Sequence, residues 1–77
     1  MLGRKIIAFV VTDAPLTEVR FAAAAHDFSL VVEPAPDSCR YDVILADDVT
    51  PRPNLARTLL MELSRLWPGT VVSERGS

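Results

Sequence analysis

The sequence is poor in several residue types on which common kinds of site depend. Cysteine occurs once, as Cys39, so no disulfide can form within one chain, and a reducing compartment is indicated. Histidine also occurs once, which leaves no histidine pair for a metal site. The three glycines, Gly3, Gly69 and Gly76, do not form a glycine-rich phosphate-binding loop. We therefore expect no nucleotide site of the usual kind.

Long apolar runs and blocks of positive charge are missing as well. The run from Ile6 to Val11 is only six residues long, whereas a membrane-spanning helix needs about 20. It is also too short for the apolar region of a secretory signal, so we expect a cytoplasmic protein without membrane contact. The eight Lys and Arg residues are scattered and the formal net charge is −2, so nucleic acid is not an expected partner.

What the chain does have is the composition of a packed globular protein. Hydrophobic residues make up 49% of its 77 residues and charged residues of both signs 23%, so a single domain over residues 1–77 is expected. A domain of this size buries only about 60% of the surface that its unfolded chain exposes. Because no disulfide can add stability, association with a second chain is the expected supplement.

Apolar runs and turn residues predict six elements in the order β-α-β-β-α-β. Asp13 is the expected N-cap of the first helix, Asn54 that of the second, and Pro68-Gly69 ends the second. Leu60, Leu63 and Trp67 recur at helical spacing and are expected in the core. The predicted strands cover residues 5–11, 29–33, 41–46 and 70–73, and the predicted helices run from Asp13 to about Phe28 and over residues 54–67.

The alternation of strands and helices predicts an α/β fold with a mostly parallel sheet. Right-handed crossovers then give a four-stranded sheet in the order 2-1-3-4 with one helix on each face. A ferredoxin-like arrangement has the same order of elements but pairs its strands antiparallel. We favour the parallel sheet because the Pro-rich segment 34–40 is longer than a tight hairpin needs.

Three segments resemble parts of a response-regulator receiver domain, which has a flavodoxin-like fold. Residues 41–51 (YDVILADDVTP) resemble the third receiver strand, with Asp47 at the phospho-acceptor position. Residues 10–16 (VVTDAPL) resemble the end of the first receiver strand, where Asp13 is the one acidic residue. Residues 71–73 (VVS) are similar to the fourth receiver strand, with Ser73 in the place of the switch hydroxyl. The resemblance implies a magnesium site formed by Asp13, Asp47 and Asp48. Because Lys5 is the only lysine and no fifth strand follows, the likeness is to a truncated and degenerate receiver.

These features lead to a functional hypothesis with open alternatives. The first is a non-catalytic interaction or regulatory module, without a cofactor, that binds a signalling or regulatory protein or forms a homodimer. The second is a Mg²⁺-dependent phospho-acceptor that uses Asp47, with Asp13, Asp48 and Ser73 in the roles that the receiver resemblance implies. A small inhibitor that mimics a host protein is consistent with the same sequence features. So is a small enzyme subunit whose site is completed across an oligomer interface.

Overall fold

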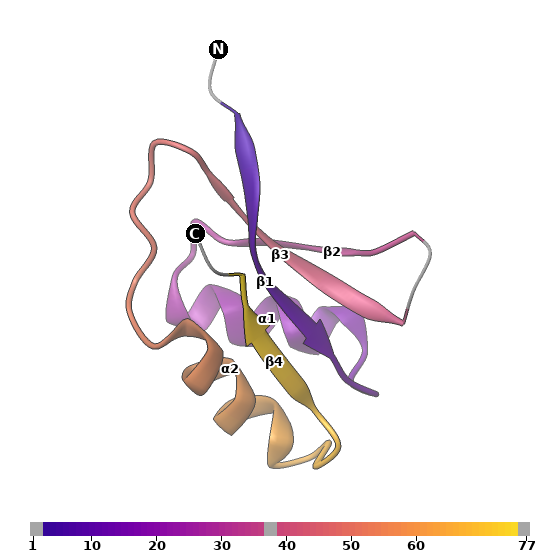
Figure 1. Ribbon diagram of the computed structural model, residues 1–77. Coiled ribbons are helices and arrows are strands. Elements are labelled where there is room, and N and C mark those ends of the chain that lie inside the picture. The colour runs from indigo at the N-terminus through magenta and orange to yellow at the C-terminus, as the bar shows by residue number, and fades with distance from the viewer. Residues whose placement is uncertain (1–2, 37–38, 76–77) are drawn as a thin grey trace.

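The computed structural model of the chain describes residues 3–36 and 39–75. Its elements follow one another in the predicted order (Figure 1). They are β1 (Arg4–Val11), α1 (Leu16–His26), β2 (Val31–Pro34), β3 (Arg40–Ala46), α2 (Leu55–Ser64) and β4 (Val71–Glu74).

The four strands form one antiparallel sheet in the order β2-β3-β1-β4. The prediction of a mostly parallel sheet in the order 2-1-3-4 was therefore wrong. The two long central strands pair directly, with Arg4 opposite Ala46 and Val11 opposite Arg40, so they run in opposite directions. This is the topology of the ferredoxin-like alternative.

The connection between β2 and β3 explains the error in strand direction. The amide of Ala35 donates a hydrogen bond to the carbonyl oxygen of Arg40 at 3.0 Å, which continues the β2–β3 pairing past the end of β2. β2 is also an edge strand, where a proline such as Pro34 is tolerated. Residues 37 and 38 of the predicted Pro-rich loop lie outside the described residues. A proline-rich segment of this length is thus compatible with a hairpin.

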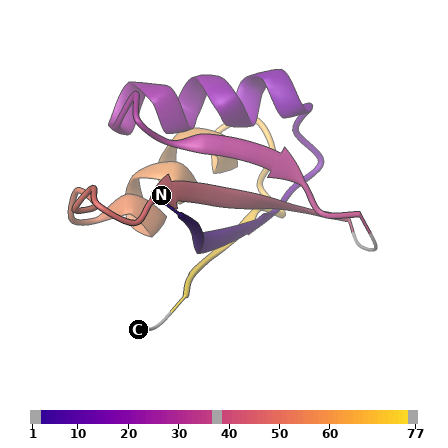
Figure 2. The same ribbon diagram turned by 90° about the horizontal axis from the view of Figure 1, so that it is seen from above.

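Both helices lie on the same face of the sheet, so the expectation of one helix on each face was also wrong (Figure 2). Each helix connects two strands that have one other strand between them. The connection from β1 to β2 and the connection from β3 to β4 cross the sheet in opposite directions. The two pairs of strands that they connect also run in opposite directions. Two right-handed crossovers related in this way place their helices on one face. Within residues 3–36 and 39–75, no helix lies on the other face of the sheet.

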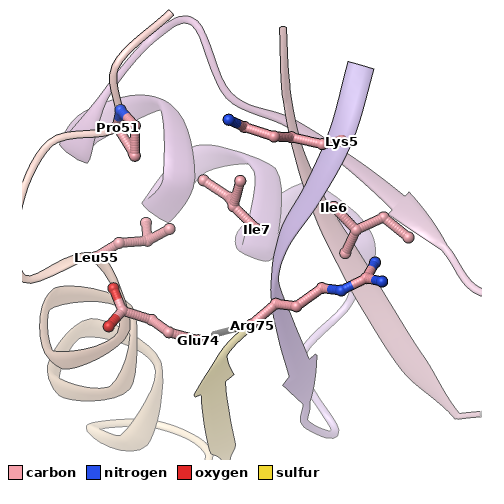
Figure 3. Close-up of a pocket in the computed structure, with 7 residues that line it drawn as sticks. All are labelled: Lys5, Ile6, Ile7, Pro51, Leu55, Glu74 and Arg75. Atoms are coloured by element: carbon pink, nitrogen blue, oxygen red, sulfur yellow. The ribbon is translucent and has the colours of Figure 1, made fainter. Parts of the chain in front are cut away.

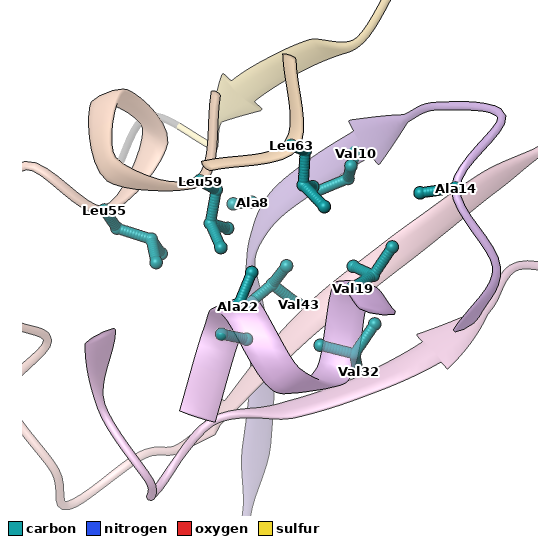
Figure 4. Packing of buried hydrophobic residues seen from close by; sticks show 11 residues of the cluster. Ala8, Val10, Ala14, Val19, Ala22, Val32, Val43, Leu55, Leu59 and Leu63 are labelled. Atoms are coloured by element: carbon teal, nitrogen blue, oxygen red, sulfur yellow. The ribbon is translucent and has the colours of Figure 1, made fainter. Parts of the chain in front are cut away.

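The core fills the space between this pair of helices and the sheet (Figure 4). Small side chains on α1, Ala22 and Ala23, are buried there and allow the helix to approach the strands closely. Of the residues predicted in the core, Leu63 is buried, Trp67 is half-buried and packs against it, and Leu60 is exposed. The buried cluster consists of Ala8, Val10, Ala14, Val19, Ala22, Ala23, Val32, Val43, Leu55, Leu59 and Leu63.

The helix starts differ from the prediction in one case. Pro15, not Asp13, occupies the N-cap position of α1, and the Asp13 side chain is exposed. Asn54 does occupy the N-cap position of α2, in a left-handed conformation with φ of 65°, but its side chain makes no capping hydrogen bond. Both helices are shorter than predicted, by up to three residues at each end.

A chain of hydrogen bonds ties the end of β1 to the start of β4. The Thr12 hydroxyl accepts from the Ala14 amide at 3.2 Å and lies 2.7 Å from the Thr70 hydroxyl. The Thr70 hydroxyl donates to the carbonyl oxygen of Trp67 at 2.6 Å. These bonds fix the loops at this end of the sheet.

Truncation of a buried side chain tests the position of α2. Leu63→Ala is expected to lower the free energy of unfolding by about 2–5 kcal/mol, since Leu63 is only 2% exposed. The matched control is Met61→Ala on the same helix, where a side chain that is 61% exposed is removed at a cost of less than about 0.5 kcal/mol. Urea denaturation measures both, and equal small losses would contradict the packing of α2.

Candidate interaction surface

The structure does not gather the carboxylates that the sequence placed in one site. Asp13 follows the carboxyl end of β1, whereas Asp47 and Asp48 follow that of β3. Because β1 and β3 are antiparallel, their carboxyl ends lie at opposite ends of the sheet. Ser73 lies opposite Phe9, within β4. Among residues 3–36 and 39–75, no three His, Cys, Asp or Glu side chains lie close enough to hold a metal ion.

The surface that stands out instead is the face of the sheet that no helix covers. Residues directly opposite each other on neighbouring strands share a face, so the strand register assigns the side chains. We call this surface the open face. Its apolar members are Ile6, Phe9 and Val11 of β1, Val31 of β2, Ile44 of β3 and Val71 of β4.

The apolar side chains of the open face are substantially accessible to solvent. Val71 is 55% exposed, Val11 47% and Val31 38%, while Ile6, Phe9 and Ile44 are half-buried. Single exposed apolar side chains are normal on a protein surface, but here six of them share one face of one sheet. A contiguous apolar patch of this kind is typical of a binding surface.

A polar cluster lies in the middle of the open face. The Nε of Arg40 is 3.2 Å from Oδ1 of Asp42, and this is the one ion pair among the described residues. The guanidinium of Arg40 also lies over the Phe9 ring, 4.5 Å from its centroid. Since the Asp42 side chain is only 13% exposed, its charge is neutralised within the face. The centre of the open face is therefore electrically neutral.

Apart from Arg4 at the start of β1, the remaining charges of the open face lie near its two edges and have opposite signs. Glu33 lies opposite Asp42, on the edge strand β2. Arg75 follows β4 at the other edge, and its side chain points to the same side of β1 as Ile6 (Figure 3). The open face thus has an acidic edge and a basic edge on either side of a neutral centre.

A β-bulge in β1 contributes to this arrangement. The register with β3 shifts between Ile6 and Ala8, so Ile7 is an extra residue in β1. Ile7 and Ala8 both pack on the helix side, while Ile6 and Phe9 belong to the open face. A continuously apolar run such as residues 5–11 is typical of a strand buried on both faces, but in the structure one side of β1 is accessible to solvent.

The charged members of the open face carried a signal in the sequence. Arg40, Asp42 and Ile44 are spaced two residues apart, which places them on one side of any strand. Their opposite charges at that spacing indicate an ion pair on a solvent-facing side. Glu33 joins them only through the β2–β3 register, which the sequence did not provide.

In comparisons with known proteins, no family model, curated protein or solved structure matches this chain. The receiver resemblance accordingly has no support beyond the residues that suggested it. Within the part of the chain that the structure describes, no helix has the length and apolar character needed to cross a membrane. Fold and surface together define a small two-layer α/β protein with one uncovered sheet face.

The separation of the carboxylates has a direct consequence for Mg²⁺. Because Asp13 lies at the opposite end of the sheet from Asp47 and Asp48, millimolar Mg²⁺ is expected to leave the amide resonances of all three residues unchanged. A two-dimensional NMR titration checks this, with Ca²⁺ as a comparison ion. A saturable shift at both Asp13 and Asp47 would contradict the separation.

Removal of the central cation tests the polar cluster. Arg40→Ala deletes both the contact with the Phe9 ring and the partner of a mostly buried carboxylate, so a loss of about 1–2 kcal/mol of stability is expected. Arg57→Ala, at an exposed position of α2, is the matched control and is expected to cost less than about 0.5 kcal/mol. Equal unfolding midpoints for the two variants in urea would show that the cluster does not stabilise the fold.

Proposed function

We propose that this protein is a non-catalytic interaction module that binds a second copy of itself through the open face. The observation that carries the proposal is the position of both helices on one side of the sheet, which leaves six apolar side chains on the other side without a covering layer. An antiparallel sheet can leave one face in water when that face is polar, but this face carries six apolar side chains. A second copy supplies that cover.

The charge pattern of the open face favours a second copy over an unrelated partner. When two such faces stack about a two-fold axis parallel to the strands, β2 of one copy lies over β4 of the other. Glu33 of each copy then lies over Ser73 of its partner, two residues from Arg75 and within reach of its long side chain, while the neutral centres meet. The face is therefore complementary to itself, which is the property that a two-fold interface requires.

The size of the open face sets the strength of the association. With strands about 4.8 Å apart and four to eight residues long, the face covers on the order of 400 Å². Two such faces bury on the order of 800 Å² in total, which is below the roughly 1,200–2,000 Å² of stable interfaces. We therefore expect a reversible dimer that responds to protein concentration, as suits a regulatory contact.

The geometry gives less support to the Mg²⁺-dependent phospho-acceptor. Transfer of a phosphoryl group to Asp47 needs a metal ion and further charged groups beside it. Asp13 lies at the other end of the sheet, and Ser73 belongs to the middle of β4 opposite Phe9. The fold instead brings together the exposed residues of the open face, which supports a contact surface.

A charged substitution in the open face tests the dimer. Val71→Glu is expected to weaken dimerisation at least tenfold, because it places a carboxylate within the apolar contact. The control is Met61→Glu, a change at a similarly exposed position of α2, which is expected to leave the mass unchanged. Light scattering over a concentration series measures the mass, and a monomer at every concentration, or equal effects of the two variants, would refute the proposal.

A charge exchange tests the two-fold geometry separately. Glu33→Lys alone and Arg75→Glu alone are each expected to weaken the dimer, because each places like charges opposite one another. The double variant Glu33→Lys/Arg75→Glu is expected to recover most of the association. If the double variant is weaker than either single variant, the two edges do not meet across the interface.

A further inference from the structure

Only half of β1 pairs with β4 along the edge that the two strands share. β1 has eight residues and β4 four, and β4 pairs with Ala8–Val11 alone. The Arg75 amide donates the last bond of this pairing, to the Ile7 carbonyl oxygen at 2.9 Å. Among the described residues, no strand pairs with Arg4–Ile6 on that side. We call this stretch the free edge of β1.

A pocket of about 610 Å³ lies beside the free edge (Figure 3). Ile7 of β1 and Leu55 of α2 point into it, and Pro51 closes one side. Its volume is in the range of pockets that bind a ligand or a large side chain. A segment lying along the free edge has this pocket within reach of the side chains that it directs toward α2.

The charges around the free edge indicate the kind of segment that would bind there. Arg4, Lys5 and Arg75 are cations and Glu74 is the one acidic pocket residue, in a chain whose net charge is −2. The Lys5 side chain extends along the rim of the pocket toward Pro51 and forms no ion pair with any described residue (Figure 3). This edge is therefore locally positive and is complementary to acidic side chains.

We propose that an extended, acidic segment of a partner protein adds as a strand to the free edge of β1. The segment lies in line with β4 and exchanges backbone hydrogen bonds with Arg4 and Ile6. One of its side chains enters the pocket between Ile7 and Leu55, and its carboxylates face Lys5 on the helix side of the sheet and Arg4 on the other side. The site borders the open face at Ile6 and Arg75, but its pocket side chains Lys5, Ile7 and Leu55 lie on the far side of the sheet from the valines of the dimer contact.

Selection from short random peptides displayed against the immobilised full chain tests the proposal. The peptides that bind are expected to be acidic, with apolar residues between the carboxylates. In an NMR titration with the best peptide, the amides of residues 4–7, 74 and 75 are expected to shift most. Lys5→Glu is expected to weaken binding at least tenfold, and Lys5→Gln by less. Arg57→Glu, the same charge change on exposed α2, is expected to bind as the wild type does.

Two further measurements separate an added strand from simple charge attraction. Methylation of alternate backbone nitrogens in the peptide is expected to abolish binding, because an added strand needs those donors. Octanoate is the probe for a free small carboxylate. If octanoate shifts the same resonances and binds with the same affinity as the peptide, the proposal of an added strand is overturned.

Other outcomes also overturn the strand: failure to select any acidic peptide, largest shifts at Phe21 and Leu66 between the helices, or full binding by the methylated peptide. The mass of the Lys5→Glu variant in solution is expected to equal that of the wild type. A failure of peptide binding with an intact dimer would therefore remove this site and leave the proposed function standing.

Discussion

The antiparallel pairing of β1 with β3 determines the rest of the architecture. Because Arg4 lies opposite Ala46 and Val11 opposite Arg40, the two helices that follow these strands cross the sheet in opposite directions and pack on one face. Because of the same pairing, the carboxyl ends of β1 and β3 lie at opposite ends of the sheet. One register thus both creates an uncovered sheet face and prevents Asp13 and Asp47 from sharing a site.

The lengths of the strands determine what the sheet offers to a partner. Among the described residues, the short outer strands β2 and β4 pair with only part of each central strand. The bulge at Ile7 turns two consecutive side chains toward the helices. The open face and the free edge of β1 share Ile6 and Arg75, whereas Lys5, Ile7 and Leu55 belong to the pocket side alone. The proposed peptide site can therefore be altered on its pocket side without changing the open face.

Local features of the fold could be predicted from the sequence, whereas the pairing of strands could not. The order of elements and the burial of Leu63 follow from apolar periodicity, which reports on one segment at a time. Strand direction depended on whether Ala35 pairs with Arg40, and the hydrogen bond between them that closes the hairpin has no sequence signature. The location of the candidate site depends on the strand direction. In a parallel sheet the aspartates would meet, whereas the antiparallel register brings Phe9 of β1 to Arg40 and Asp42, which share one side of β3 in either case.

The central claim is that the open face is the contact surface between two copies, and NMR spectra of the labelled chain recorded over a dilution series test it most directly. The account predicts that the amide resonances of Phe9, Val11, Ile44 and Val71 move together with concentration along one binding curve, while that of Phe21 on α1 stays fixed. Resonances that stay fixed across the sheet, or that move only on the helices, would contradict it.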